Sequence, residues 1–264
     1  MADNTNNRTL KFFEFIGEKV VAPLMFLGGV AANFPALFRK RGLRKREFLY
    51  YLDLCGAKSV PVVALICFLM GAVLGIQAML QMRKVGTDIF VVDLVGFAVL
   101  KEFGPLMAAM IATGRAASAF AAEIGTMKVN DEINALETMG IPPLAYLVYP
   151  KLLAMLIALP LLTVIGDVSG IAGGMLVGVS MEIPPVAYWS RTVAVLDFVT
   201  FLLGIGKTLC FAALITLAGC FCGFKSAPDA QGVGRGATSA VVVSIFLVVV
   251  ADAVITLLYS FIGY

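Results

Sequence analysis

The chain has 264 residues, of which 60% are hydrophobic and only 14% are charged. Soluble proteins have about 45–50% apolar and about 25% charged residues, so a soluble globule of this size could not cover its surface with so few charges. This composition excludes a soluble enzyme, a disordered chain and a nucleic-acid binder that uses a basic patch. It predicts an integral membrane protein with several helices.

Two residue types restrict the chemistry further. The chain has no histidine, which removes the commonest general base and the commonest metal ligand. Its five cysteines are odd in number and lie mostly in apolar runs. We therefore interpret them as small hydrophobic side chains, and we expect neither a cofactor nor a metal centre.

The N-terminal region differs from the rest of the chain. Residues 8–46 alternate charged and aromatic side chains, continue into an apolar stretch and end in a basic cluster. We expect a helix that lies in the membrane interface. A sixth span within residues 20–38 is the alternative, although it would place Arg8 and Lys11 on the side that basic residues avoid.

Five long apolar segments follow, and a helix of about 20 residues is enough to cross the hydrocarbon core. They are unbroken and lack the alternation of membrane β-strands. The third contains Pro160 and Asp167 and is too long for one perpendicular helix. The predicted spans are residues 59–82, 93–113, 147–179, 198–224 and 238–264, which form a bundle over 59–264.

The distribution of basic residues predicts the orientation. Residues 39–46 contain six Lys or Arg and precede the first span, so that side should be cytoplasmic. With five spans, the N-terminus is then cytoplasmic and the C-terminus lies outside. Residues 115–146 are a cytoplasmic segment in this topology, and the glycine-rich residues 232–236 are expected to form a flexible cytoplasmic loop.

Glycine spacing predicts that the spans pack closely on one another. Small residues four positions apart share a helix face and let backbones approach, as lipid provides no hydrophobic drive between helices. The glycines with this spacing are Gly71 and Gly75, then Gly170, Gly174 and Gly178, and finally Gly219 and Gly223.

The segment 204–208 resembles the end of a phosphate-binding loop, but the glycine that should begin the pattern is replaced by Phe201. It also lies inside a predicted span. We therefore expect no nucleotide binding here, and we expect Lys207 to extend toward the interface or to pair with a carboxylate.

Lys101 and Glu102 are charges inside a predicted span, where each costs about 2.5–3.5 kcal/mol on insertion scales. Both therefore need a partner or a water-filled cavity. One interpretation is that each pairs with another span, for instance through Asp167, Lys207 or Asp252. The other is that they line a polar cavity for a substrate with charged groups. The sequence leaves both open.

The segment between the second and third spans predicts a short amphipathic helix. Asn130 is the expected N-cap, with Asp131 and Glu132 in the first turn, where the helix dipole favours acids. An apolar stripe follows at helical spacing, and Gly140 ends the helix. Such a helix can lie on the membrane or dock into the groove of a soluble partner.

These residues resemble the MlaE (YrbE-type) permeases of ABC transporters that move lipids with MCE-domain partners. The resemblance covers the chain from about residue 10 and is densest over residues 100–140. It lies in Leu100-Lys-Glu-Phe-Gly-Pro105, Ala112-Thr-Gly-Arg-Ala-Ala-Ser118 and Ala122-Glu-Ile-Gly-Thr-Met-Lys128, then in Glu132, Gly140, Pro143, Pro150, residues 159–163, Gly173-Gly174, Gly223 and Ala237-Thr238.

The resemblance implies one permease domain over residues 1–264 in a bacterial inner membrane, with an interfacial N-terminal helix, five spans and a periplasmic C-terminus. It also implies a homodimer, a separate cytoplasmic ATPase, an MCE-domain protein, a lipid substrate and room for a small regulatory subunit. The helix between spans two and three would be the coupling helix. The residues carried over to ATPase contact are Glu123, Gly125, Thr126, Met127, Lys128, Glu137 and Gly140.

The family's charged pair in the second span, usually Arg-Glu, is implicated in the lipid cavity. Here it is Lys101-Glu102, and lysine keeps the charge but lacks the two-pronged contact of arginine with phosphate. The chain is thus predicted to be a permease rather than an enzyme, moving lipid, in most of the family phospholipid. The alternative is a stand-alone ion-coupled carrier that uses Lys101, Glu102, Asp167 and Asp252 as an ion path.

Overall fold

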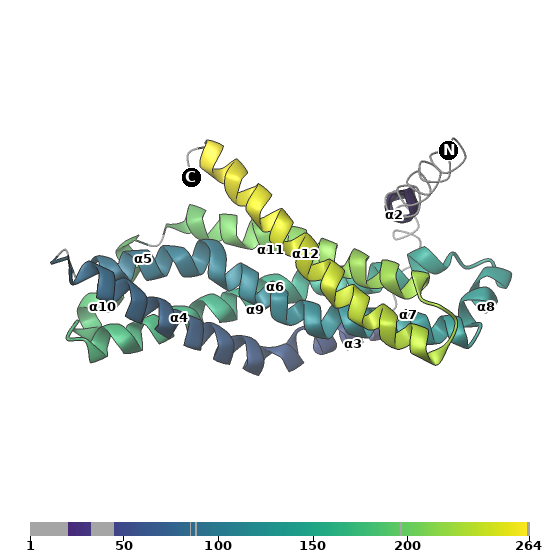
Figure 1. Cartoon of the computed structure of the whole chain (residues 1–264), viewed down its shortest axis with the longest axis horizontal. Coiled ribbons are helices and arrows are strands. Elements are labelled where there is room, and N and C mark those ends of the chain that lie inside the picture. Colours follow the sequence, from purple (N-terminus) through teal and green to yellow (C-terminus); the bar gives the residue numbers. More distant parts are fainter. Residues whose placement is uncertain (1–20, 33–44, 85, 88, 196, 263–264) are drawn as a thin grey trace, which may run out of the picture.

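The protein is described by a computed structural model, which covers residues 21–32, 45–84, 86–87, 89–195 and 197–262. Over these ranges the chain is helical and has no β-strand. The helices form an elongated bundle (Figure 1). Five helical segments are long and apolar enough to span a membrane, which confirms the predicted all-α membrane fold. They are Lys45–Met82, Phe90–Val129, Pro143–Ser180, Phe198–Lys225 and Ala230–Phe261.

The N-terminal apolar helix is α2, Ala22–Ala32, and it is shorter than the five spans. Its 11 residues extend about 16 Å, roughly half the thickness of the hydrocarbon core. The ring of Phe26 lies 5.6 Å from that of Phe221, and the Tyr149 hydroxyl donates a hydrogen bond to the Val30 carbonyl. The remainder of the predicted interfacial region, residues 8–20 and 33–44, lies outside the described residues.

The first span begins with α3 (Lys45–Cys55) and continues through a short 3-10 turn, η3 (Ala57–Ser59), into α4 (Val60–Met82). Pro61 occupies the first turn of α4, where the missing amide hydrogen would have had no partner in the helix. The predicted span, residues 59–82, agrees with α4 to within one residue.

The second span is one continuous helical segment that contains two π-helical turns. Its parts are α5 (Phe90–Ala98), η4 (Val99–Phe103), α6 (Gly104–Ala112), η5 (Thr113–Ala117) and α7 (Ser118–Val129). The predicted end at residue 113 is therefore wrong. The helix continues because Ala117, Phe120 and Ile124 of its last turns are completely buried, so tertiary contacts extend it beyond the charge of Arg115.

The short helix expected between spans two and three is α8, Glu132–Thr138. Asp131, not Asn130, precedes it, with a left-handed φ of 56°, which aspartate tolerates better than most residues. The Asn134 amide donates to Asp131 Oδ1 at 2.9 Å. Gly140, with φ of 71°, follows the helix as predicted.

The third span is α9, Pro143–Ser180, a single helix that continues through Pro150 and Pro160. Its 38 residues extend about 57 Å, more than a perpendicular crossing needs. It contacts α3, α4, α6 and α11 and is the centre of the bundle. The helix α10, Pro185–Val195, follows at the opposite end of the bundle from α8 (Figure 1).

The last two spans are α11 (Phe198–Lys225) and α12 (Ala230–Ile262). The predicted loop over residues 232–236 is wrong, because these glycines lie in the first turns of α12. The Asp229 carboxylate accepts a hydrogen bond from the Gly232 amide at 2.7 Å, which stabilises this early helix start. In Figure 1, α12 crosses the bundle obliquely, and near its C-terminal end the Tyr259 hydroxyl still donates a hydrogen bond to the Leu203 carbonyl of α11 at 3.3 Å.

Glycines bring the helix backbones into direct contact, as their spacing predicted. A Cβ at Gly71 on α4 would overlap the carbonyl of Gly170 on α9, and one at Gly173 would overlap the Phe68 carbonyl. Gly219 of α11 likewise faces Ala117 of η5, where a Cβ would lie 3.0 Å from the Ala117 Cα. The bundle is thus held by close van der Waals contact between backbones.

We expect Gly71→Ala to lower the thermal stability of the detergent-solubilised protein. The added methyl group would force α4 away from α9, and overpacking of this kind costs about 1–3 kcal/mol. Gly114→Ala is the matched control, because a Cβ there has open space around it. Equal melting temperatures for the two variants would contradict the close α4–α9 contact.

Candidate functional site

A polar network around Lys207 of α11 lies inside the bundle. The residue is 1% exposed, and its ammonium donates to Glu102 at 2.7 Å, to Asp252 at 3.0 Å and to Thr256 at 2.7 Å. The Thr256 hydroxyl donates in turn to Glu102 Oε1 at 3.1 Å. One cation therefore joins two carboxylates, and the network connects the second, fourth and fifth spans.

Local backbone geometry positions this network. Glu102 lies in the π-helical turn η4, and such turns frequently occur at functional sites. A Cβ at Gly204 would overlap the Leu100 carbonyl, so the glycine lets α11 approach η4 directly. Lys207 lies three residues beyond this contact, which places its ammonium beside the η4 turn.

The structure brings together only part of the predicted site. Glu102 pairs with another span through Lys207, as one of the two interpretations predicted. Its neighbour Lys101 is half-buried and has no ion-pair or hydrogen-bond partner among the residues that the structure describes. Thr256 was not predicted, and its only signal in the sequence is its position four residues after Asp252, on the same helix face.

A second ion pair lies at the α10 end of the bundle. Arg191 donates from Nε and Nη2 to the two carboxylate oxygens of Asp93, at 2.8 and 2.6 Å. This bidentate bond raises the pKa of the Arg191 guanidinium. It fastens α10 to α5, and it is a structural contact that the sequence analysis did not predict.

A third polar cluster lies toward the α8 end. Lys151 of α9 has no exposed surface, and its ammonium lies 2.9 Å from the Tyr51 hydroxyl and 3.3 Å from Glu123 Oε1. Tyr51 donates to the same carboxylate oxygen at 2.5 Å. The cluster joins α3, α7 and α9, so Glu123, which the family resemblance assigned to ATPase contact, binds groups inside its own chain.

The other residues assigned to ATPase contact fall into two groups. On α7, Gly125 is buried beside Ser226, and Lys128 donates to the carbonyls of Phe224 and Ser226 at 2.9 and 2.7 Å. Two members are accessible on or just after α8, namely Glu137 and Gly140. Of the remaining α7 members, Thr126 is exposed and Met127 is partly buried against the core.

The family model described as Permease MlaE matches residues 48–258 of this chain. The chain belongs to the MlaE permease family. A probable ABC transporter permease protein of Rickettsia typhi is 34% identical over 257 residues, which cover 97% of this chain and 96% of that protein.

Two further relatives extend the family beyond that genus. The intermembrane phospholipid transport system permease protein MlaE of Haemophilus influenzae is 29% identical, covering 94% of this chain and 97% of that protein. The chloroplastic protein TRIGALACTOSYLDIACYLGLYCEROL 1 of Arabidopsis thaliana is 31% identical, covering 80% of this chain and 61% of that protein. MlaE membership makes this chain a multi-pass membrane permease of the ABC type rather than an enzyme.

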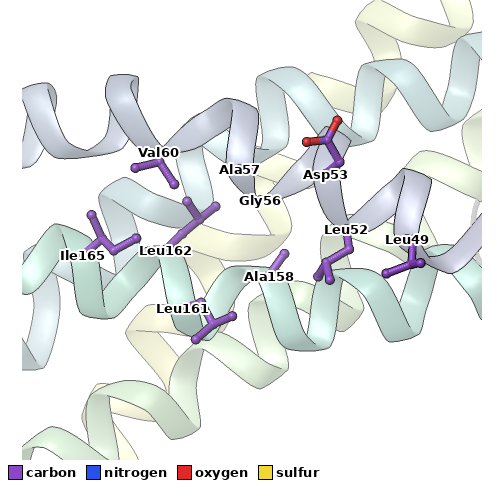
Figure 2. A pocket seen from close by; sticks show the side chains of 10 residues that line it. All are labelled: Leu49, Leu52, Asp53, Gly56, Ala57, Val60, Ala158, Leu161, Leu162 and Ile165. Atoms are coloured by element: carbon purple, nitrogen blue, oxygen red, sulfur yellow. The ribbon is translucent and has the colours of Figure 1, made fainter.

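An apolar groove of about 440 Å³ lies between α3, η3, the start of α4 and α9 of this MlaE permease. Figure 2 shows its aliphatic walls, formed by Leu and Ile side chains of α9 that face those of α3 and α4. Asp53 is its single charged lining residue and pairs with Lys58 at 2.9 Å, both half-exposed. Such walls suit an acyl chain better than a polar ligand.

We expect Lys207→Met to destabilise the MlaE fold strongly, because Glu102 and Asp252 would lose their shared cation. Breaking a fully buried pair costs about 3–5 kcal/mol, and the effect should be smaller here since Glu102 is 32% exposed. Thermal unfolding in detergent measures the loss.

The matched control for this prediction neutralises the whole network. The triple variant Lys207→Met, Glu102→Gln, Asp252→Asn contains no uncompensated charge, so we expect it to recover much of the lost stability. A triple variant as unstable as Lys207→Met alone would contradict charge pairing as the source of the stabilisation.

Proposed function

We propose that this chain is the permease subunit of an ATP-driven transporter that moves phospholipid between a bacterial inner membrane and an MCE-protein conduit. The observation that carries the proposal is the MlaE family match over residues 48–258. The H. influenzae relative is named for intermembrane phospholipid transport. In this proposal residues 1–264 form one permease domain, with residues 8–46 at the interface and residues 59–264 in the transmembrane bundle.

The substrate-binding role falls chiefly on Lys101, the lysine of the η4 turn. Glu102 is occupied by Lys207 and Thr256, so we assign it to positioning the turn rather than to direct contact with substrate. Lys101 has no such partner within the described chain. A phosphate group would supply the missing counter-charge, and its hydrogen bonds to an ammonium would be charge-assisted.

We expect Lys101→Ala to slow lipid transfer by about tenfold, which corresponds to the loss of one charge-assisted hydrogen bond. The assay is movement of a fluorescent phospholipid between vesicles carrying the reconstituted transporter and acceptor vesicles. Lys101→Arg should retain transfer, and Lys84→Ala, at an exposed lysine, is the control. Normal transfer by a well-assembled Lys101→Ala transporter would refute the substrate-binding role.

A homodimer forms along α12 in this proposal. This helix is the least buried of the five spans, and its exposed large residues include Val242, Phe246, Val250, Val254 and Leu257. Asp252 and Thr256 of the same helix belong to the Lys207 network. Two copies joined here would bring their networks to the two sides of a shared cavity, in which the lipid binds.

The α8 end of the bundle contacts the separate cytoplasmic ATPase, which also makes the N-terminus cytoplasmic and the C-terminus periplasmic. Support comes from the accessible residues Glu137, Met139 and Gly140, which follow the buried Leu136 in the sequence. A displacement of α8 would act on α7, and α7 continues without interruption to the η4 turn. ATP-driven movement would thus reach Lys101 and Glu102 through one helical segment.

We expect Glu137→Lys to weaken capture of the ATPase while the permease still inserts in the membrane, because the exposed charge at the proposed contact is reversed. Affinity purification of the tagged permease, with quantification of the co-purified ATPase, measures the effect. Glu182→Lys, an exposed acid between α9 and α10, is the control at the other end. Unchanged recovery of the ATPase with Glu137→Lys would count against the coupling helix.

The alternative, a stand-alone ion-coupled carrier, requires its acids to form one path through the membrane. Glu102 and Asp252 do share Lys207. Asp167 has no ion pair or hydrogen bond to this network in the described part of the chain, which disfavours a continuous relay. An accessible α8 has no purpose in a carrier that works without an ATPase.

A further inference from the structure

Asp167, on α9, differs from the other acids inside the bundle. Only 4% of the residue is exposed, and its Oδ1 atom has no hydrogen-bond partner among the described residues. Glu102 and Glu123, by contrast, each contact a lysine ammonium. A buried carboxylate without a donor is unfavourable, because it loses its hydration without replacing it. The described chain therefore supplies no donor that stabilises the ionised form of Asp167.

The helix opposite Asp167 leaves room for its carboxylate. A Cβ at Gly104, the first residue of α6, would overlap Asp167 Oδ1. The glycine therefore lets the carboxylate fit at the contact between α6 and α9. Any larger residue at position 104 would displace the Asp167 carboxylate. The α6–α9 contact therefore accommodates a polar side chain where two apolar helices would be expected to touch.

Asp167 also lines a cavity of about 350 Å³ between η4, α9 and the start of α11. A second carboxylate, Asp197, lies on its wall, and the two rings are those of Phe198 and Phe201. The other lining residues are aliphatic, namely Leu100, Val164, Val168 and Ile171, and none of the lining residues is Lys or Arg. Two carboxylates and two aromatic rings favour a cation, since the face of an aromatic ring attracts ammonium groups.

We propose that this cavity binds the primary ammonium of an aminophospholipid headgroup, with Asp167 and Asp197 as its acceptors. The inference rests on the proposed function and adds a headgroup class to it. A primary ammonium has three donors and no acceptor, which matches a site with carboxylates alone. Lys101, to which the proposed function assigns the phosphate, directly follows Leu100 of the cavity wall in the sequence.

The test measures which phospholipids the intact transporter retains. The detergent-solubilised complex is equilibrated with equal amounts of phosphatidylethanolamine and phosphatidylglycerol of identical acyl chains, and the co-purified lipids are quantified by mass spectrometry. We expect the native protein to enrich phosphatidylethanolamine and Asp167→Asn to lower this enrichment by about tenfold. Glu182→Gln, at an exposed acid between α9 and α10 that lines neither cavity, should leave it unchanged.

The outcomes separate this inference from the proposed function. Retention of both lipids in the supplied ratio by the native protein, or equal enrichment by Asp167→Asn, would overturn the ammonium site alone. Retention of neither lipid would overturn the proposed function as well. If Asp167→Asn cannot be recovered folded, Asp197→Asn decides, because Asp197 is exposed. An enrichment unchanged by that variant overturns the proposal.

A further arm distinguishes a lipid from a soluble amine. Free ethanolamine in millimolar excess carries the same ammonium without acyl chains. The proposal expects the phosphatidylethanolamine preference to survive this addition, since the chains contribute most of the binding. Loss of the preference would identify a soluble amine as the occupant and overturn the assignment to lipid.

Discussion

The architecture depends on one constraint, the high free energy of an uncompensated charge inside a membrane. Lys207 meets this constraint by joining two carboxylates from two other spans. The three helices must therefore adopt one relative position for the charges to be satisfied together. Because lipid supplies little hydrophobic drive between helices, the network gives the second, fourth and fifth spans a register that apolar contacts alone would specify weakly.

Backbone contacts at glycines make this register possible. The ammonium of Lys207 reaches Glu102 because Gly204 brings α11 against the Leu100 carbonyl. Elsewhere Gly71 and Gly170 do the same for the first and third spans. Closely packed spans leave few alternative arrangements, so a movement at one end of the bundle is transmitted rather than absorbed. The proposed coupling to a separate ATPase requires this property.

The sequence predicted the fold well and the polar contacts only in part. Five apolar runs determined the five spans, because length and hydropathy are properties of each segment alone. The extension of the second helix to Val129 depends on burial of Phe120 and Ile124 by other helices, which no local pattern contains. The early start of α12 likewise depends on the Asp229 cap. The glycines at residues 232–236 had instead indicated a loop.

The candidate site shows the same limit. The need of Glu102 for a partner followed from its position in a span, but only the packed bundle shows that Lys207 is this partner and that Asp252 shares the same ammonium. The ion pair between Glu123 and Lys151 could not be predicted either. The family resemblance indicates which residue stands at a position, but it does not indicate which groups that residue contacts. Lys101, whose charge has no partner in the described chain, is the residue that we propose for substrate binding.

The central claim, a permease that works with a separate ATPase on a phospholipid, is tested most directly by native mass spectrometry of the gently solubilised complex. We predict two copies of this chain with an equal number of ATPase subunits, an MCE-domain protein and retained phospholipid. A lone permease without a nucleotide-binding partner, under conditions that preserve another ABC complex, would contradict it and favour the carrier.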